Sequence, residues 1–437
     1  MSVVTEVVGG LSVRPCGRVK TRPPRPIITL PVNTVNLTTS LEEKSNRLNP
    51  AVALFVLGAL LRLALAFTLP LYPARTVLPG YNDEPLHLFY VQHLAAGGGI
   101  PVWGVSADSS EHLAGEFTQP PLYYATASSP YKLGEALHNG WGMYLARLVS
   151  VVCGLVAALF TYRIATLWFR KDSGNVIALG AFAAMLLAPN AVVFSSIVTN
   201  DALLMALSAL SFYSIIRCRL ESTSVTRQFL AGLFIAAAVW TKMSGLLLIP
   251  LIWFAAPPEV SLNVKWALRL RIGLVAVMGV MPLFGWKLAH YGHIFPRTPG
   301  YGPESVLGIA GGAVHHPVMA MKIWLRTAAQ PLDAVWGSLP EKLVSLVWVV
   351  IWGGLTTFGA FTLLKDRTGG LFLTSAALLL LAFIYRNIGL FQVEFRTLAP
   401  AFPALAVMAG VGAAGAKLNV ITQVILWVTP LVILPFL

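Results

Sequence analysis

Long runs of apolar residues, separated by short polar stretches, fill most of the chain after residue 49. A helix needs about 20 mainly apolar residues to cross a bilayer, and it tolerates fewer where other helices bury it. By this criterion we predict about eleven transmembrane helices, and therefore an all-α polytopic membrane protein. The predicted spans are 50–69, 143–168, 176–189, 201–216, 228–240, 243–256, 272–290, 343–364, 371–386, 398–416 and 420–436. The short pair around Trp240-Thr241-Lys242 is compatible with either a tight hairpin or a partly re-entrant element.

Composition supports this class of protein. Of the 437 residues, 56% are hydrophobic and only 11% are charged, and the mean hydropathy is +0.72, whereas soluble domains carry about 25% charged residues. The net charge of +13 comes from short basic clusters between the apolar segments. The positive-inside rule explains such clusters, so we expect no nucleic-acid partner. Cys16, Cys153 and Cys218 are too scattered for a disulfide framework or a zinc site.

The distribution of charge predicts the orientation. Residues 1–50 contain seven Lys/Arg and three Glu, whereas residues 70–142 contain two Lys/Arg and six Asp/Glu. The first segment should therefore face the cytoplasm and the second should lie outside, as should the second long loop at about 291–342. We expect residues 1–49 to be a disordered cytoplasmic tail without a cleavable signal peptide, and a sequon at Asn36 within it to be a chance match. The transmembrane module would then comprise residues 50–437, in the plasma (inner) membrane of a prokaryote.

The two long outer loops are the places where function is expected, because loops of this length are uncommon otherwise. Within the first loop, the apolar stretches Pro85–Leu94 and Leu122–Leu137 predict helices that lie along the membrane interface. Just before the first stretch, Asp83 and Glu84 form a pair of carboxylates close to a membrane boundary. Adjacent acids are often only surface residues, but a carboxylate near an apolar boundary has a raised proton affinity and can act as a general base.

The acidic pair is followed by a second polar cluster, EFTQPPLYY, that begins at Glu116. An Asp-Glu pair after the first span together with a Pro-Pro-Leu element resembles the C-type glycosyltransferase superfamily, which includes the protein O-mannosyltransferases and the lipid A aminoarabinose transferases. In this chain Gln119 stands where those enzymes have a basic residue, so a cation for a phosphate must come from elsewhere. The resemblance implies a sugar donor carried on a polyprenyl phosphate, with Asp83 as the base that activates an acceptor hydroxyl. Glu84 would orient the acceptor or the sugar.

Further candidates lie at the predicted outer ends of later spans. Asn200 and Asp201 open a span, where helix capping is the simpler explanation, although the resemblance also implies an acid that faces the cavity at this point. Lys242 and Arg396 are outer-side cations that we expect to bind the lipid phosphate, with snorkelling of Lys242 and an ion pair between Arg396 and Glu394 as the alternatives. Arg386 is a weaker third candidate for the phosphate. The predicted substrate-binding residues are His87, Glu116, Gln119, Tyr123, Tyr124, Asn200, Lys242 and Arg396, and the predicted catalytic residues are Asp83, Glu84 and Asp201.

The sequence leaves metal dependence open. His87 and the pair His315-His316 are more typical of solvated loops than of a metal site, although some members of the superfamily use a divalent cation. Tyr123-Tyr124 and Trp336-Gly337 could stack on a sugar ring, but aromatic belts at the membrane interface explain most such residues.

Three classes of function fit a protein of this kind. The first is an inverting glycosyltransferase, transferring a hexose or a pentose, that acts on the outer side of the membrane. The second is a transporter or flippase of lipid-linked sugars, which should show ionisable residues near the bilayer midplane and repeated halves with broken helices. The third is a non-catalytic assembly or receptor protein, which leaves the long polar outer loops without a purpose. The absence of an internal repeat and the position of the charges favour the glycosyltransferase.

Overall fold

Helices make up the regular secondary structure of the part of the chain that the computed structural model describes, and no strand occurs there. The described residues all belong to the unit formed by residues 49–437. They are 49–69, 71, 83–106, 112–169, 174–220, 224–295, 318, 339–365, 369–389, 395–419, 422 and 425. The predicted tail at 1–49 (except Asn49), most of the loop 291–342 and most of the predicted span 420–436 lie outside this part.

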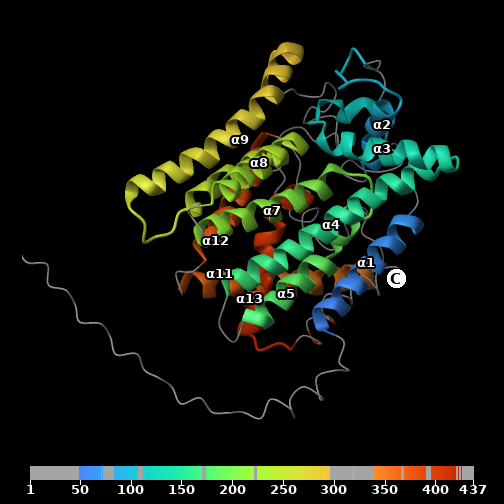
Figure 1. Cartoon of the computed structure of the whole chain (residues 1–437). Helices are drawn as coiled ribbons and strands as arrows, with labels where there is room; N and C mark the ends of the chain where they lie inside the picture. Colours follow the sequence, from blue (N-terminus) through green and yellow to red (C-terminus); the bar gives the residue numbers. More distant parts are fainter. Residues whose placement is uncertain are drawn as a thin grey trace, which may run out of the picture. The chain divides into compact units, whose positions relative to one another are not determined.

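The helices follow the chain in the order shown in Figure 1. They are α1 (Pro50–Thr68), α2 (Glu84–Ala95), η1 (His112–Thr118), α3 (Leu122–Leu137), α4 (Trp141–Trp168), α5 (Gly174–Leu187), α6 (Pro189–Phe194), α7 (Asn200–Leu220), α8 (Val225–Thr241), η2 (Met243–Ala255), α9 (Leu262–Tyr291), α11 (Leu339–Lys365), α12 (Gly370–Gly389), η4 (Phe395–Ala401) and α13 (Phe402–Gly415). The η elements are 3-10 helices.

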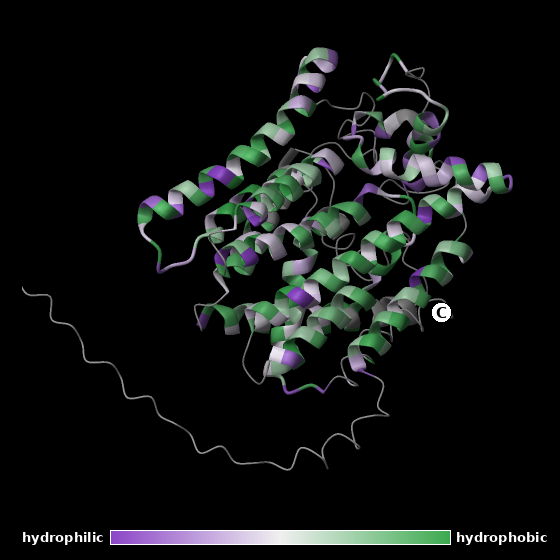
Figure 2. Ribbon diagram, viewed as in Figure 1, coloured by the Kyte–Doolittle hydropathy of each residue, from purple (hydrophilic) through white to green (hydrophobic). Residues whose placement is uncertain are grey.

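Five described helical segments are long and apolar enough to cross a membrane: α1, α4, α7, α9 and the segment Leu398–Gly415. Hydrophobic residues cover most of their surface (Figure 2). The described apolar helices α5, α8 and η2 are shorter, as is the apolar part Val349–Lys365 of α11. The protein is therefore an integral membrane protein, and the total of about eleven spans stays a prediction.

The centre of the bundle is built around α5. Twelve of its fourteen residues are buried, and it packs between α4 and α13. Small residues allow this close packing. A Cβ atom on Gly410 of α13 would meet the backbone of α5 at Ile177 and Ala181, and one on Gly412 would meet the carbonyl oxygen of Leu355 in α11.

A buried arginine supports the break that follows α5. Pro189 begins α6 and has no backbone N–H, so not every carbonyl group at the end of α5 can accept a helical hydrogen bond. Arg62 of α1 is fully buried and donates to the carbonyl oxygens of Leu186 (2.7 Å) and Met185 (3.1 Å). Its Nε also donates to Ser195 Oγ at 2.7 Å. This arginine therefore fixes the segment that leads into α7.

The segment 225–255 is a hairpin. The chain reverses at Lys242, whose backbone is extended, and η2 packs back against α8 and α7. The second arm is a 3-10 helix interrupted by Pro250. The helices predicted within the first outer loop are also present, as α2 and α3.

Candidate active site

A buried ion pair fixes the beginning of α2. Arg147 of α4 donates to both oxygens of Glu84, from Nε at 2.7 Å and from Nη2 at 2.6 Å. Both side chains are fully buried. The Nη1 group of the same arginine donates to the carbonyl oxygens of Ala66 (2.9 Å) and Leu69 (2.8 Å) at the end of α1. The backbone N–H of Val198 donates to Glu84 Oε1 at 2.7 Å. One pair thus joins α1, α2, α4 and the segment before α7.

The carboxylate of Glu84 has no exposed surface, and Arg147 and Val198 donate hydrogen bonds to its oxygens. The role expected for Glu84, orienting the acceptor or the sugar, stays a prediction, and this arrangement favours an indirect effect through the first turn of α2. Arg147 was not identified from the sequence, although a charged residue inside an apolar segment is a recognisable signal of a buried partner.

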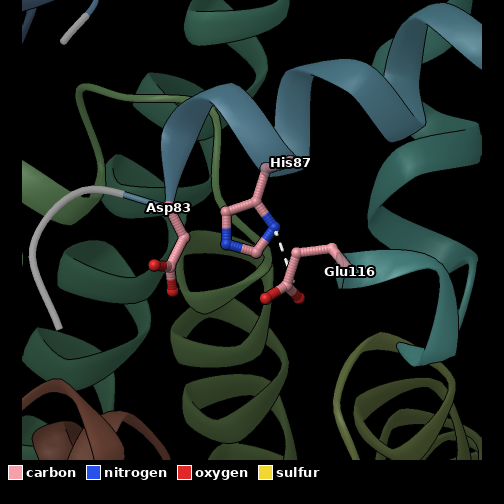
Figure 3. Close-up of side chains that lie close together, drawn as sticks. All are labelled: Asp83, His87 and Glu116. Carbon is pink, nitrogen blue, oxygen red and sulfur yellow. Dashed lines mark ion pairs between the residues drawn. The ribbon is translucent and has the colours of Figure 1, made fainter. Parts of the chain in front are cut away.

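Asp83, His87 and Glu116 form a cluster next to this pair (Figure 3). Asp83 precedes α2 and His87 lies one turn later, so the two side chains share a face of the helix. Glu116 comes from η1. A carboxylate oxygen from each acid and a ring nitrogen of the histidine all lie within 4.8 Å of one another. His87 Nδ1 is 3.8 Å from Glu116 Oε2.

These ligand types suit a divalent cation. Carboxylate oxygens bind Mg²⁺, Ca²⁺ and Mn²⁺, and an added imidazole also suits Zn²⁺. Asp83 and Glu116 are partly accessible, whereas His87 is buried. The sequence analysis placed all three residues in one candidate site, but it did not combine them as metal ligands, because only the folded loop brings η1 against α2. A bound cation would supply positive charge for a phosphate.

Tyr124 connects the cluster to α7. Its hydroxyl lies 2.8 Å from His87 Nδ1 and 3.5 Å from Glu116 Oε2, and it accepts a hydrogen bond from Asn200 Nδ2 at 3.3 Å. Its ring stacks on Tyr90, with the centroids 3.9 Å apart. Burial, together with the negative charge of Glu116, raises the pKa of Tyr124 well above its ordinary value. The hydroxyl therefore keeps its proton and can donate a hydrogen bond to a neighbour.

The two tyrosines after the Pro-Pro-Leu element are fully buried. Their stacking on a sugar stays a prediction, and the structure shows them in contact with neighbouring helices. Tyr123 contacts Ser150 Oγ at 2.7 Å and accepts from the Thr199 N–H at 3.0 Å. The prolines place these residues at the start of α3, where a fixed φ favours the first helical turn. Gln119, just before them, is only partly buried.

A second ion pair lies at the start of α7. Lys242 Nζ is 2.6 Å from Asp201 Oδ1. The aspartate is buried, whereas the lysine side chain is 21% exposed. Asp201 Oδ2 and Asn200 Oδ1 are buried without a hydrogen-bond partner among the described residues. The backbone N–H of Asp201 donates to Thr199 Oγ1 at 3.3 Å. One carboxylate oxygen of Asp201 binds Lys242 and the other has no partner among the described residues, so this side chain does not cap the helix.

The loop with Glu116 is held from α9 by residues that the sequence did not reveal. Lys287 is buried, and its Nζ donates to the carbonyl oxygen of Thr118 at 2.7 Å. Tyr291 OH donates to the carbonyl oxygen of Phe117 at 3.4 Å. The sequence does contain a signal for Lys287, because an isolated lysine within an apolar segment indicates a buried polar partner.

Several predicted candidates lie outside the described part. They are the side chains of Arg396 and Arg386, together with His315, His316, Trp336 and Gly337.

Comparisons with known proteins give one family match and several structures with a similar fold. Residues 118–286, fewer than half of the chain, match the family model described as dolichyl-phosphate-mannose-protein mannosyltransferase. No curated protein matches the chain. ArnT from Cupriavidus metallidurans bound to undecaprenyl phosphate is similar in structure, with a TM-score of 0.52 and 17% identity. The match covers 84% of this chain and 60% of that chain.

Two other structures are more distant. The apo state of the same ArnT gives a TM-score of 0.49 at 18% identity, over 84% of this chain and 60% of that one. The archaeal oligosaccharyltransferase AglB from Archaeoglobus fulgidus, in complex with an inhibitory peptide and a dolichol-phosphate, gives 0.43 at 11% identity, over 83% and 50%. The family match and the fold shared with ArnT confirm the resemblance that the sequence motifs indicated: the chain resembles the C-type glycosyltransferases and has their fold.

Proposed function

We propose that the protein is an integral-membrane glycosyltransferase that moves a sugar from a polyprenyl-phosphate donor to an acceptor hydroxyl. The observation that carries this proposal is the meeting of Asp83, His87 and Glu116 at one end of the bundle. ArnT, which shares the fold, was solved with undecaprenyl phosphate, and this supports a donor of the same chemical class.

In the proposed reaction, the carboxylate of Asp83 accepts the proton of the acceptor hydroxyl as its oxygen attacks C1 of the sugar. The bond between C1 and the phosphate oxygen breaks, and the electron pair leaves with polyprenyl phosphate. Attack from the face opposite the phosphate inverts the configuration at C1. The phosphate needs a cation rather than a general acid, so one carboxylate is enough, unlike in a glycosidase, where two carboxyls flank the bond.

Other side chains would position these groups. Glu84, held by Arg147, fixes the first turn of α2 and thereby the position of Asp83. Asp201 orients Lys242, whose exposed portion can approach an anion. His87, Gln119 and Arg396 complete the proposed binding residues, with Arg396 as a second cation for the phosphate.

The charge pattern supports placing the site on the outer face of a prokaryotic plasma membrane, with a cytoplasmic N-terminus and about eleven spans. A hexose and a pentose fit the mechanism equally well.

The test uses the full chain in proteoliposomes with sugars on polyprenyl phosphates and a panel of acceptors. Asp83→Asn should abolish transfer without loss of folding or donor binding, since it removes the base and keeps the shape. Glu259→Gln, an exposed acid outside the site, is the matched control and should retain full transfer. Transfer by Asp83→Asn at the unmodified rate would refute the role of Asp83. Vesicles that move the lipid across the membrane without ever transferring sugar would instead identify a flippase.

A further inference from the structure

A pocket lies at the end of α7 that is remote from the candidate active site. This helix begins at the candidate active site and ends beside Arg219, and the rise of 1.5 Å per residue separates Asp201 from Arg219 by roughly 27 Å along the helix. The pocket has a volume of about 280 Å³. It is lined by Trp168, Arg219, Trp253, Phe254, Ala256, Pro257, Pro258, Lys265, Arg269, Gly370 and Leu371.

Among the described residues, the lining carries three cations and no acid. Each cation donates to backbone carbonyl oxygens of the last residues of η2 or of the segment that follows it. Arg219 Nη1 donates to Ala256 at 3.3 Å, and Lys265 Nζ donates to Pro258 at 2.7 Å. No described carboxylate forms an ion pair with these cations, although Glu259 attracts Arg219 at longer range.

Arg269 is arranged for an anion in particular. Its guanidinium lies over the ring of Trp253 at 3.8 Å, with Trp266 at 5.5 Å. Stacking of this kind fixes the plane of the group, which leaves its edge available for a phosphate. Nη2 donates to the carbonyl oxygen of Trp253 at 3.1 Å, but Nε is buried without a hydrogen-bond partner among the described residues. An unsatisfied donor is costly, and a nearby anion reduces that cost.

We propose that this pocket binds the phosphate-bearing headgroup of an anionic membrane lipid. Exposed tryptophans favour a lipid over a free anion: Trp253, which lines the pocket, is 57% exposed, and Trp266, near the start of the spanning helix α9 and beside Trp253, is 52% exposed. Tryptophan at such positions lies at the level of the lipid headgroups, and basic pockets between transmembrane helices bind them. The site is separate from the proposed donor site and does not depend on the proposed function.

The experiment measures lipid binding to the purified full chain in detergent by native mass spectrometry and thermal unfolding. The probes are phosphatidylglycerol, phosphatidylcholine of the same acyl chains, and inorganic phosphate. We expect phosphatidylglycerol to bind and to raise the unfolding temperature, with little effect of phosphatidylcholine. Arg269→Gln and Lys265→Gln should each weaken binding of phosphatidylglycerol roughly tenfold, which corresponds to about 1.4 kcal/mol.

The matched control is Arg271→Gln, which removes the same charge from an exposed position on α9 outside the pocket. It should bind phosphatidylglycerol as the unmodified protein does. Because Arg269→Gln also removes packing against tryptophan, Lys265→Gln keeps the test valid if the arginine variant fails to fold. Equal binding in the Lys265 and Arg271 variants would overturn the proposal. Binding of inorganic phosphate that displaces phosphatidylglycerol at equal concentration would also overturn it, in favour of a site for free anions.

Discussion

Replacing Glu84 by glutamine would leave Arg147 charged and fully buried without a counter-ion. The amide keeps one acceptor oxygen, so the arginine would lose one of its two charge-assisted hydrogen bonds, from Nε or Nη2, and would face an NH2 donor at that position. The lost bond contributes roughly 1.5–3 kcal/mol. With the loss of the counter-charge, we expect a total near the roughly 3–5 kcal/mol typical of removing one partner of a buried pair. A typical protein has about 5–15 kcal/mol of total stability. We therefore expect Glu84→Gln to lower the unfolding temperature sharply.

A double-mutant cycle separates the pair from other effects. Arg147→Met should destabilise the protein to a similar extent, because it leaves the carboxylate of Glu84 buried and uncompensated. The double variant should be more stable than the sum of the two losses predicts, by roughly 2–3 kcal/mol, since neither charge is then left alone. Arg163→Met, at an exposed position on the same helix α4, is the control and should change stability little.

The measurement is unfolding of the purified chain in detergent, followed by tryptophan fluorescence and by loss of the monomer peak. Additive losses in the double variant would show that the two side chains do not interact. Losses below about 1 kcal/mol in both single variants would place the carboxylate in contact with water, and the positioning role of Glu84 would then fail.

Three further predictions concern neighbouring groups. Lys242→Met should reduce donor binding, measured by titration with polyprenyl phosphate, and should leave the buried Asp201 without its counter-ion. A second change, Asp201→Asn, should restore part of the stability but not the binding. Unchanged affinity in Lys242→Met would show that the lysine does not belong to the site. Lys287→Met should lower kcat more than it raises KM, since it releases the carbonyl of Thr118 and with it the loop that carries Glu116; equal kcat in a transfer assay would limit the lysine to packing. Glu116→Gln should weaken Mn²⁺ binding by about tenfold or more, as followed by electron paramagnetic resonance, and identical spectra in both proteins would argue against a metal at this cluster.

The apolar pattern predicted the helices better than their ends. Residues 272–290 were predicted as a span, but α9 begins at Leu262, because basic residues such as Lys265 and Arg269 mark the membrane boundary without ending a helix. The predicted span 176–189 ends close to the end of α5 at Leu187, but the short helix α6, which begins at Pro189, was not predicted. Hydropathy reports where a helix meets lipid, whereas its ends depend on backbone groups that find other partners.

The candidate site was only partly visible in the sequence. The spacing of Asp83 and His87 on one helical turn can be read directly, since it is a local property. The approach of Glu116, Arg147 and Lys287 depends on contacts between distant segments. The positive-inside rule assigns cations to loops and to the lipid surface, so it does not predict cations that are buried within the bundle, such as Arg147 and Lys287.

The contact between Lys287 and Thr118 joins positions 169 residues apart. During synthesis, Thr118 emerges long before α9 exists, and the loop that ends at Thr118 has no anchor from α9 until that helix has been made and inserted. Domains form as their chain emerges, but this loop must wait for a later helix. A ribosome-bound fragment that ends before α9 would therefore contain every residue of the Asp83 cluster and still lack the contact that holds Thr118.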